Sequence, residues 1–230
     1  MKIGVAQTRP VTGDIHQNIR LHKALIAQAV SSGADILIFP ELSLTGYEPT
    51  LAQALAVDPG DQRLDEFQQI SDTRQLIIGA GIPTRHKDGI CISMALFQPD
   101  KPRQLYSKRY LHADEEPFFV SGQNGPARIG EDIALAICYE IQVPQHAEEA
   151  FANGAKIYIA SVAKSPRGID KALERLSEIA IQYSMTVLMS NSVGPADGDE
   201  CAGRSSIWNN KGELKHQLDG HQQGILMVDI

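Results

Sequence analysis

Residues 36–41 read Ile-Leu-Ile-Phe-Pro-Glu, and this short stretch decides what kind of fold the chain can form. Four apolar residues in a row, without polar alternation, are typical of a strand that is covered on both faces. Pro40 then ends the strand, because proline has no backbone N–H with which to continue a ladder. A strand of this kind needs a layer on each side, so the stretch favours a layered α/β fold.

The same pattern recurs along the chain. Further apolar runs lie at 76–78, 133–137, 157–159 and 187–189, and an alternating segment at 2–8 predicts the first strand. Between these runs, amphipathic spacing predicts helices at 14–33, 62–73, 145–154 and 169–184. From Ser205 onward we expect short strands joined by turns at 210–212 and 219–220, with a closing strand at 224–230. Helices that alternate with buried strands predict α/β layering.

The bulk composition is that of a soluble enzyme or binding domain. The 230 residues are 43% hydrophobic and 21% charged, with no internal repeat or linker-like tract, so we expect residues 1–230 to form a single domain. The net charge of -7 arises from acidic and basic residues mixed along the chain. We therefore expect no nucleic acid and no membrane among its partners.

The cysteines argue against structural cross-links. Cys91, Cys138 and Cys201 are odd in number, widely separated and outside any CxxC pair, which speaks against a disulfide scaffold and against a zinc site. No metal ligands occur at recognisable spacing, so we expect no metal and no cofactor. A reducing cytoplasm suits such cysteines, and neither a signal peptide nor an apolar run of membrane-spanning length is evident. These features predict a cytoplasmic protein.

The first candidate site residue is Glu41, which directly follows the strand and Pro40. Polar residues at strand ends are where layered α/β folds gather reactive groups. Burial there would raise the pKa of a carboxyl towards neutrality, as suits a general base. The alternative is a structural carboxylate that caps a loop or pairs with an arginine.

Lys108 is the second candidate. It lies in the segment 105–112, Leu-Tyr-Ser-Lys-Arg-Tyr-Leu-His, at the end of an expected strand and before acidic and aromatic residues. A lysine in this position could stabilise an oxyanion. Taken alone, it could equally belong to a solvated charge cluster.

The third candidate is Cys138, which ends the apolar run 133–137 and is followed by Tyr139 and Glu140. A strand-to-turn position of this kind can present a nucleophile to a pocket. The alternative is a small core side chain, and that is the role we expect for Cys91 and Cys201.

Together the three segments resemble those of the nitrilase-like carbon-nitrogen hydrolase family, whose members carry a Phe-Pro-Glu stretch, a lysine before a Leu/His loop and an Ile-Cys-Tyr-Asp/Glu stretch in this order. The likeness extends over essentially the whole chain and includes the segments 3–7, 33–35, 153–155, 191–194 and 203–206. The ordered set is far more specific than any one motif.

The resemblance implies a four-layer αββα sandwich and a thiolate that attacks an amide-type carbon. In this scheme Cys138 is the nucleophile that forms an acyl-enzyme, Glu41 is the general base and Lys108 stabilises the tetrahedral intermediate. The backbone N–H of Tyr139 is a second oxyanion donor. Ammonia leaves first, and water activated by Glu41 then releases the acid.

Further pocket residues follow from the same resemblance. Many members place a second glutamate shortly before an aromatic pair and a glycine, which indicates Glu115, with the adjacent Glu116 as the alternative. Tyr47 and the segment 161–166, including Ser161 and Ala163, are expected to line the pocket with Tyr139.

The chain departs from the family pattern at two places. It has Ile-Ala-Ile-Gln-Tyr at 179–183 where many relatives have Arg-Ala-x-Glu-Asn, and Glu140 where an aspartate is usual. Neither departure changes Glu41, Lys108 or Cys138. Both could alter which substrate fits the pocket and how subunits pack together.

Several readings of the function remain. The favoured one is hydrolysis of a small non-peptide amide, and the alternatives within the family are hydrolysis of an N-carbamoyl compound or of a nitrile. The absence of a second domain in this sequence argues against a glutaminase fused to a synthetase. Cys138 could instead work with His112 or His146 in a papain-like arrangement, and a catalytically silent binding module is a further alternative. We expect a homodimer or a higher homo-oligomer, as is common in the family.

Overall fold

Two six-stranded sheets lie face to face in the computed structural model, which describes residues 1–123 and 125–230. In spatial order the first sheet contains β14 (Gly224–Asp229), β1 (Lys2–Gln7), β2 (Ile36–Ile38), β3 (Ile77–His86), β4 (Gly89–Phe97) and β5 (Gln104–Ser107). The second contains β13 (Leu214–Gln217), β12 (Ser206–Trp208), β9 (Thr186–Asn191), β8 (Ile157–Val162), β7 (Ile133–Ile137) and β6 (Arg128–Ile129). A separate hairpin joins β10 (Val193–Ala196) to β11 (Asp199–Ala202).

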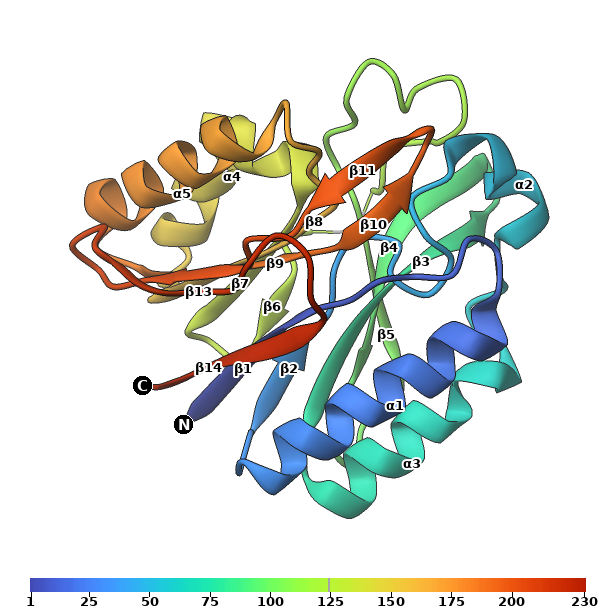
Figure 1. The fold of residues 1–230 in the computed structure, drawn as a ribbon, viewed down its shortest axis with the longest axis horizontal. Coiled ribbons are helices and arrows are strands. Elements are labelled where there is room, and N and C mark those ends of the chain that lie inside the picture. The colour runs from blue at the N-terminus through green and yellow to red at the C-terminus, as the bar shows by residue number, and fades with distance from the viewer. Residues whose placement is uncertain (124) are drawn as a thin grey trace.

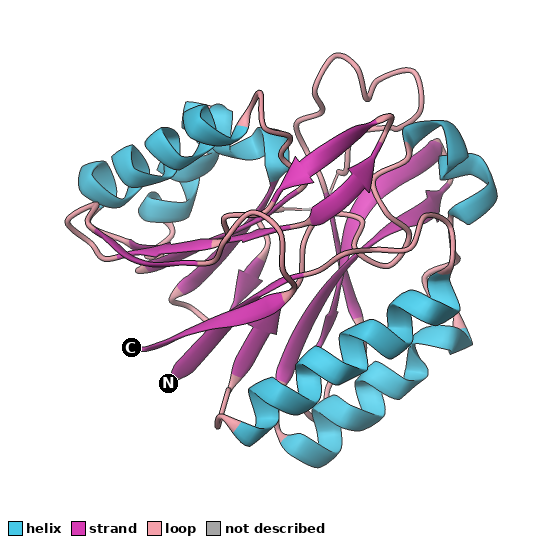
Figure 2. Cartoon of the chain, viewed as in Figure 1, coloured by secondary structure: helices cyan, strands magenta, loops and turns pink. Residues whose placement is uncertain are grey.

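Helices cover the outer face of each sheet (Figure 1). α1 (Ile15–Ser31) and α3 (Asp65–Arg74) lie against the first sheet, and α4 (Pro144–Ala152) and α5 (Ile169–Tyr183) against the second. A short helix, α2 (Ala52–Leu55), follows a 3-10 turn at Pro49–Leu51 near the far end of β3 and β4. The result is the predicted α/β fold with its four αββα layers, which are distinguished by secondary structure in Figure 2.

The apolar run in β2 shows why four layers form. Ile36 and Ile38 belong to the core between the two sheets, whereas Leu37 belongs to the core between the first sheet and its helices. All three side chains are 1% exposed or less. Alternating side chains therefore fill both cores, as a strand with both faces covered requires.

The carboxyl ends of the central strands in both sheets meet at one place. β1, β2 and β3 are parallel, as are β7, β8 and β9. The Ser161 hydroxyl at the end of β8 donates to the Phe39 carbonyl just after β2 (2.8 Å), and the Ser190 hydroxyl in β9 donates to the Ala6 carbonyl in β1 (2.6 Å). These bonds between sheets bring the loops after β2, β7 and β8 together, and those loops carry the candidate residues.

Some elements differ from the sequence prediction. The predicted helix at 62–73 begins only at Asp65, after a 3-10 turn at Gln62–Leu64. The run at 76–78 is the start of the longer strand β3, which pairs along its length with β4. In the part of the chain that the structure describes, no helix combines the length and apolar character needed to cross a bilayer.

Candidate active site

The Glu41 turn follows β2 and is packed against β3. The Leu44 N–H donates to the Gly81 carbonyl (3.0 Å), and Leu42 adopts a left-handed conformation (φ 49°). A Cβ atom at Gly81 would collide with the Leu42 nitrogen and the Pro40 carbonyl oxygen, so only glycine lets the turn approach the strand. The Glu41 carboxylate is consequently fixed in the interior, 2% exposed.

Lys108 is held at the end of β5 by its own backbone. Its N–H donates to the Ile92 carbonyl (2.8 Å), and its carbonyl accepts from the Gly122 N–H (2.7 Å). A Cβ atom at Gly122 would collide with the Ser107 carbonyl, which explains why a glycine follows the aromatic pair. The lysine side chain is fully buried.

Cys138 begins a 3-10 helix, Cys138–Gln142, directly after β7. Its φ of 43° lies in the left-handed region, which costs a non-glycine residue about 1 kcal/mol or more. Strain of this kind is found where a sharp strand-to-turn connection presents a nucleophile. The side chain is 7% exposed.

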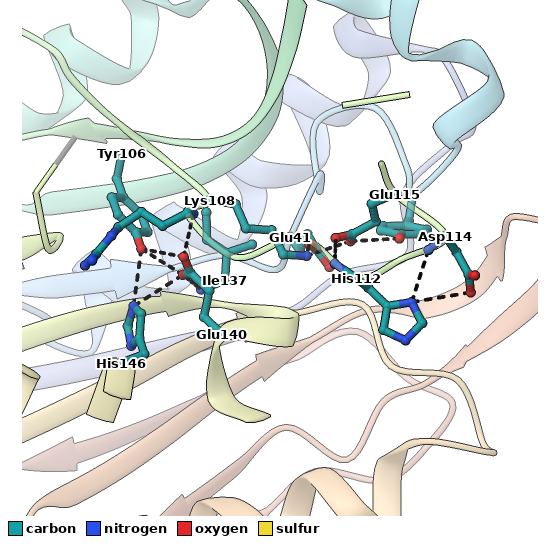
Figure 3. Close-up of polar contacts among 11 residues, drawn as sticks. Glu41, Tyr106, Lys108, His112, Asp114, Glu115, Ile137, Glu140 and His146 are labelled. Carbon is teal, nitrogen blue, oxygen red and sulfur yellow. Dashed lines mark hydrogen bonds and ion pairs between the residues drawn. The ribbon is translucent and has the colours of Figure 1, made fainter. Parts of the chain in front are cut away.

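The Lys108 ammonium joins two carboxylates (Figure 3). Its Nζ lies 2.8 Å from Glu41 Oε1 and 2.6 Å from Glu115 Oε1. The Tyr47 hydroxyl donates to the same Glu115 oxygen (3.0 Å), and the His112 N–H donates to Glu115 Oε2 (2.8 Å). Residues from the loops after β2 and β5 are thus bound into one network.

Glu115 is the member of its pair that reaches the interior. Its side chain is 2% exposed, whereas Glu116 is exposed to solvent. The structure therefore resolves the placement that sequence left open between them.

The electrostatics of the cluster follow from its burial. Loss of solvent raises the pKa of Glu41 above its ordinary value, although the Lys108 charge opposes this. Burial also raises the pKa of the Cys138 thiol, and the Glu41 charge adds to that effect. Burial alone would lower the pKa of Lys108, but the charges of Glu41, of Cys138 when it is deprotonated, and of Glu115 raise it. Lys108 is therefore a permanent cation, and Cys138 carries its proton at neutral pH.

One oxygen of Glu41 has no partner. Among the described residues, Glu41 Oε2 is buried without a hydrogen bond of ordinary geometry, while Oε1 accepts from Lys108; interaction with the Cys138 thiol lowers the pKa of Glu41, against the effect of burial. A buried carboxylate oxygen without a donor is unfavourable by about 1–3 kcal/mol or more. Such an oxygen is a ready acceptor for a proton.

Glu140 ties together the two loops that carry Lys108 and Cys138. It is fully buried and accepts from the Ile137 N–H (2.7 Å) and from the Arg109 N–H (2.7 Å). Ile137 directly precedes Cys138, and Arg109 directly follows Lys108. The Tyr106 hydroxyl donates to both of its oxygens, at 2.7 and 2.8 Å. Sequence reasoning noted Glu140 only as a departure from the family pattern and did not foresee this role.

A cavity of about 560 Å³ opens onto Cys138. Residues from the predicted pocket that line it are Tyr47, Glu115, Tyr139 and Ala163. Ser161 is absent from the described lining, because its hydroxyl points to the Phe39 carbonyl of the opposite sheet. The structure thus gives Ser161 an inter-sheet contact in place of the predicted position at the pocket.

Two further residues of the cavity bear on its chemistry: Lys164, which belongs to the segment 161–166 expected at the pocket, and Cys201, which sequence reasoning did not place there. Lys164, after β8, lines it next to Ala163. Cys201, in β11, lines it as well, although we expected only a core side chain there. Burial raises the pKa of Cys201 to about 12, so its thiol stays protonated. Cys201 stands in no motif, and only the fold brings it beside Cys138.

The histidine alternatives find no contact with the thiol. The His146 ring is buried against Glu140 (Nε2 to Oε2 3.4 Å), and burial lowers its pKa to about 4. The His112 ring packs edge-on against Tyr139, with its side chain half exposed. Within residues 1–123 and 125–230, no hydrogen bond joins Cys138 to either ring, and no group of three His, Cys, Asp or Glu residues is arranged to hold a metal.

Comparison with known proteins finds one family profile and several relatives that match nearly the whole chain. Residues 2–230 match the family profile described as carbon-nitrogen hydrolase. The glutamine-dependent NAD(+) synthetase of Thermotoga maritima is 24% identical over 242 residues, which span 100% of this chain and 42% of the synthetase. The 2-oxoglutaramate amidase of Bacillus subtilis is 25% identical over 225 residues, 95% of this chain and 86% of that enzyme. The chain thus spans less than half the length of the synthetases it matches.

Solved structures show the same fold. An amidase from Nesterenkonia sp. superposes with a TM-score of 0.86 at 24% identity, covering 100% of this chain and 90% of that one. A variant of that amidase was solved in complex with butyramide, at 23% identity and the same TM-score of 0.86.

Proposed function

Because this chain belongs to the carbon-nitrogen hydrolase family, we propose that residues 1–230 act as one amidase domain that hydrolyses a small non-peptide amide through a thioester on Cys138. The observation that carries the proposal is the unpartnered Oε2 of Glu41, a buried acceptor in the same cluster as Lys108 and Cys138. Its other oxygen is already occupied by the lysine. A base with one oxygen free and one oxygen fixed is oriented for proton transfer.

In the first half of the reaction, the Cys138 proton passes to Glu41 and the sulfur forms a bond to the amide carbon. The carbonyl π electrons move to oxygen, where the Lys108 ammonium and the Tyr139 N–H stabilise the oxyanion. Collapse of this intermediate breaks the carbon–nitrogen bond. The nitrogen takes the proton from Glu41 and leaves as ammonia, with the acyl group on sulfur.

In the second half, Glu41 takes a proton from water as the water oxygen attacks the thioester carbon. A second tetrahedral intermediate forms at the same oxyanion position. Its collapse breaks the carbon–sulfur bond, releases the carboxylic acid and returns the proton to Cys138. The raised pKa of Glu41 supports both halves, because it makes the carboxylate a stronger base towards the thiol and towards water.

The names of the relatives support a substrate with a primary amide. The Bacillus subtilis relative is a 2-oxoglutaramate amidase, and the structural neighbour from Nesterenkonia was solved with butyramide. A cavity of about 560 Å³ has room for a molecule of this size. Cys138 and Glu115 line this cavity, and Glu115 is ion-paired to the buried Lys108, so the reacting amide rather than a long acyl chain is expected beside them.

Hydrolysis of the glutamine side-chain amide is the second candidate. It is favoured by the match of the whole chain to glutamine-dependent NAD(+) synthetases. The chemistry at Cys138 would be the same, and only the group that fills the mouth of the cavity would differ.

A substrate panel with matched cysteine variants tests the proposal. Short-chain amides, ω-amides of dicarboxylic acids, glutamine, N-carbamoyl compounds and nitriles would be incubated with wild type, Cys138→Ala and Cys91→Ala while ammonia is measured. We expect ammonia from wild type and from Cys91→Ala with an amide, and none from Cys138→Ala. Equal release by Cys138→Ala would contradict the proposal. Release by wild type only from N-carbamoyl compounds or only from nitriles would show that the substrate belongs to that class and is not a simple amide.

A further inference from the structure

Lys164 is a second lysine beside Cys138, carried by the neighbouring strand. β7 and β8 are parallel, with Ile137 paired to Ser161, so the residues after both strands emerge at the same edge. Cys138 follows the first strand directly and Lys164 follows the second after a short extension. Both side chains line the same cavity.

The backbone of Lys164 is fixed in place. Its N–H donates to Asn191 Oδ1 (2.8 Å), and its carbonyl accepts from the Ala202 N–H (2.8 Å). Asn191 in turn donates to the Gly203 carbonyl (2.7 Å). The loop after β8, strand β9 and the β10–β11 hairpin thus hold the lysine in one position. A rigid support of this kind is typical of a group with a defined function.

In the described part of the chain, Lys164 forms no ion pair with a carboxylate, although the charge of Glu41 acts on it from a distance. Among the described residues, none of the ion pairs formed within 4.0 Å includes Lys164, although the residue is only partly exposed. A partly buried cation without a counter-ion is unfavourable unless an anion forms beside it. The sulfur of Cys138 becomes such an anion after it has lost its proton, and its charge affects Lys164 more strongly than that of Glu41 does.

The charges of the buried cluster lead to the same conclusion. Glu41 and Glu115 are two carboxylates that share the single ammonium of Lys108. Transfer of the Cys138 proton to Glu41 moves the excess negative charge to sulfur without removing it. A second cation is therefore needed for the cluster to hold a thiolate without a net charge.

We propose that Lys164 is this second cation: it faces Cys138 Sγ as the counter-ion of the thiolate and, with Lys108, brackets the reacting centre. The inference rests on the proposed function for its place in the reaction. In the step itself, the S–H bond of Cys138 breaks, an O–H bond forms on Glu41, and the sulfur keeps the electron pair between two ammonium groups. No further reactant is required.

The electrostatic effects of the two groups on each other support this placement. The negative charge that Cys138 carries as a thiolate is the main cause that raises the pKa of Lys164 above its ordinary value. Conversely, Lys164 and Lys108 counteract the rise in the pKa of Cys138 that burial and Glu41 cause.

Other titratable groups around the sulfur also contribute to the pH dependence of Cys138 alkylation. Inside the site they are Glu41, Tyr47, Lys108, Glu115 and Cys201. At the mouth of the cavity they are His112, Asp114, Arg167, Asp197, Asp199 and Glu200. Because all of these stay unchanged in a Lys164 variant, a difference between variant and wild type isolates the lysine.

The test measures how fast iodoacetamide alkylates Cys138 as a function of pH, followed by intact mass and peptide mapping. The proteins compared are wild type, Lys164→Met, Lys164→Arg and Lys171→Met, the last changing an exposed lysine of α5. For Lys164→Met we expect the midpoint of the pH profile to rise by about one unit or more and alkylation at pH 7 to slow roughly tenfold. Lys164→Arg should restore most of the rate, and Lys171→Met should match wild type.

Two results would overturn the inference. An unchanged alkylation profile in Lys164→Met would show that the lysine does not act on the thiolate. The same unchanged profile combined with a higher KM only for amides that carry a carboxylate would make Lys164 a substrate anchor. Iodoacetamide needs no amide substrate, so a shifted profile in a protein that releases no ammonia would uphold the inference while the proposed function fails.

Discussion

The Lys108 ammonium lies 2.6 Å from Glu115 Oε1, within a site where both side chains are excluded from solvent. Glu115 therefore fixes the lysine that is proposed to meet the oxyanion. Glu115→Gln keeps the shape of the side chain and removes its charge, so we expect a roughly 100-fold loss of kcat with a smaller change in KM. Single-turnover ammonia release measures this. Glu116→Gln, which changes the exposed neighbour, should behave as wild type, and equal losses in the two variants would refute the special role of Glu115.

Glu140 should control the geometry of the site without meeting the substrate. Ile137 N–H and Arg109 N–H donate to different oxygens of Glu140, so Glu140→Gln keeps an acceptor for one of them and turns an NH2 group towards the other. We expect a loss of about 2–4 kcal/mol in the free energy of unfolding, because a buried donor loses its acceptor, and a fall in kcat that exceeds any rise in KM. Urea unfolding and steady-state kinetics give both values. A variant with wild-type kcat would show that the bonds of Glu140 do not position Lys108 and Cys138.

The close approach at Gly81 should be intolerant of even one methyl group. Because a Cβ atom there would collide with the backbone of the Glu41 turn, Gly81→Ala should displace the turn, destabilise the fold by about 1–3 kcal/mol and reduce activity strongly. Gly60→Ala is the matched control, since an added methyl group there would have no other atom within 4 Å and the Gly60 backbone is not left-handed. Thermal unfolding and ammonia release distinguish the two. Similar behaviour of both variants would contradict the packing argument.

The pH dependence of kcat/KM should report the raised pKa of Glu41. A general base works only when deprotonated, so activity falls as the pH drops through the pKa of the folded protein. Since burial raises that pKa above the ordinary value of 4.5, the acid limb should lie at a pH above 4.5. Initial rates with an uncharged amide at constant ionic strength measure the profile. A rate that stays constant down to pH 4.5 would mean that Glu41 is not the base.

Much of the fold could be predicted from sequence because buried strands leave continuous apolar runs. The run at 133–137 is strand β7 as predicted, and the helix predicted at 169–184 is α5, Ile169–Tyr183. The strand Gly89–Phe97 was missed, since its apolar residues are mixed with serine and cysteine and its pairing with β3 is a long-range feature. The β10–β11 hairpin was missed for a related reason: it contains turn formers and charges and little apolar alternation.

In the site, too, the residues within local motifs could be predicted, whereas contacts that depend on long-range strand pairing could not. Glu41, Lys108 and Cys138 follow expected strands within motifs. The structure pairs the first two, joins Lys108 to Glu115, and places Cys138 on the cavity that Glu115 also lines. Lys164 was expected at the pocket only as part of the segment 161–166, and no role could be assigned to its charge, because a lysine after a strand has the pattern of an ordinary solvated charge. Its proximity to Cys138 depends on the register of β7 against β8, which no local pattern encodes. The homo-oligomer and the cytoplasmic location stay predictions.

The central claim is that Cys138 becomes acylated during turnover. The most direct test mixes wild type with an amide that it hydrolyses, quenches the reaction in acid within the first turnover and determines the intact mass and the modified peptide. The account predicts an added mass equal to the amide minus ammonia, located on Cys138 and absent from Cys138→Ala. Ammonia release with no adduct at any quench time, or with the adduct on another residue such as Cys201, would contradict it.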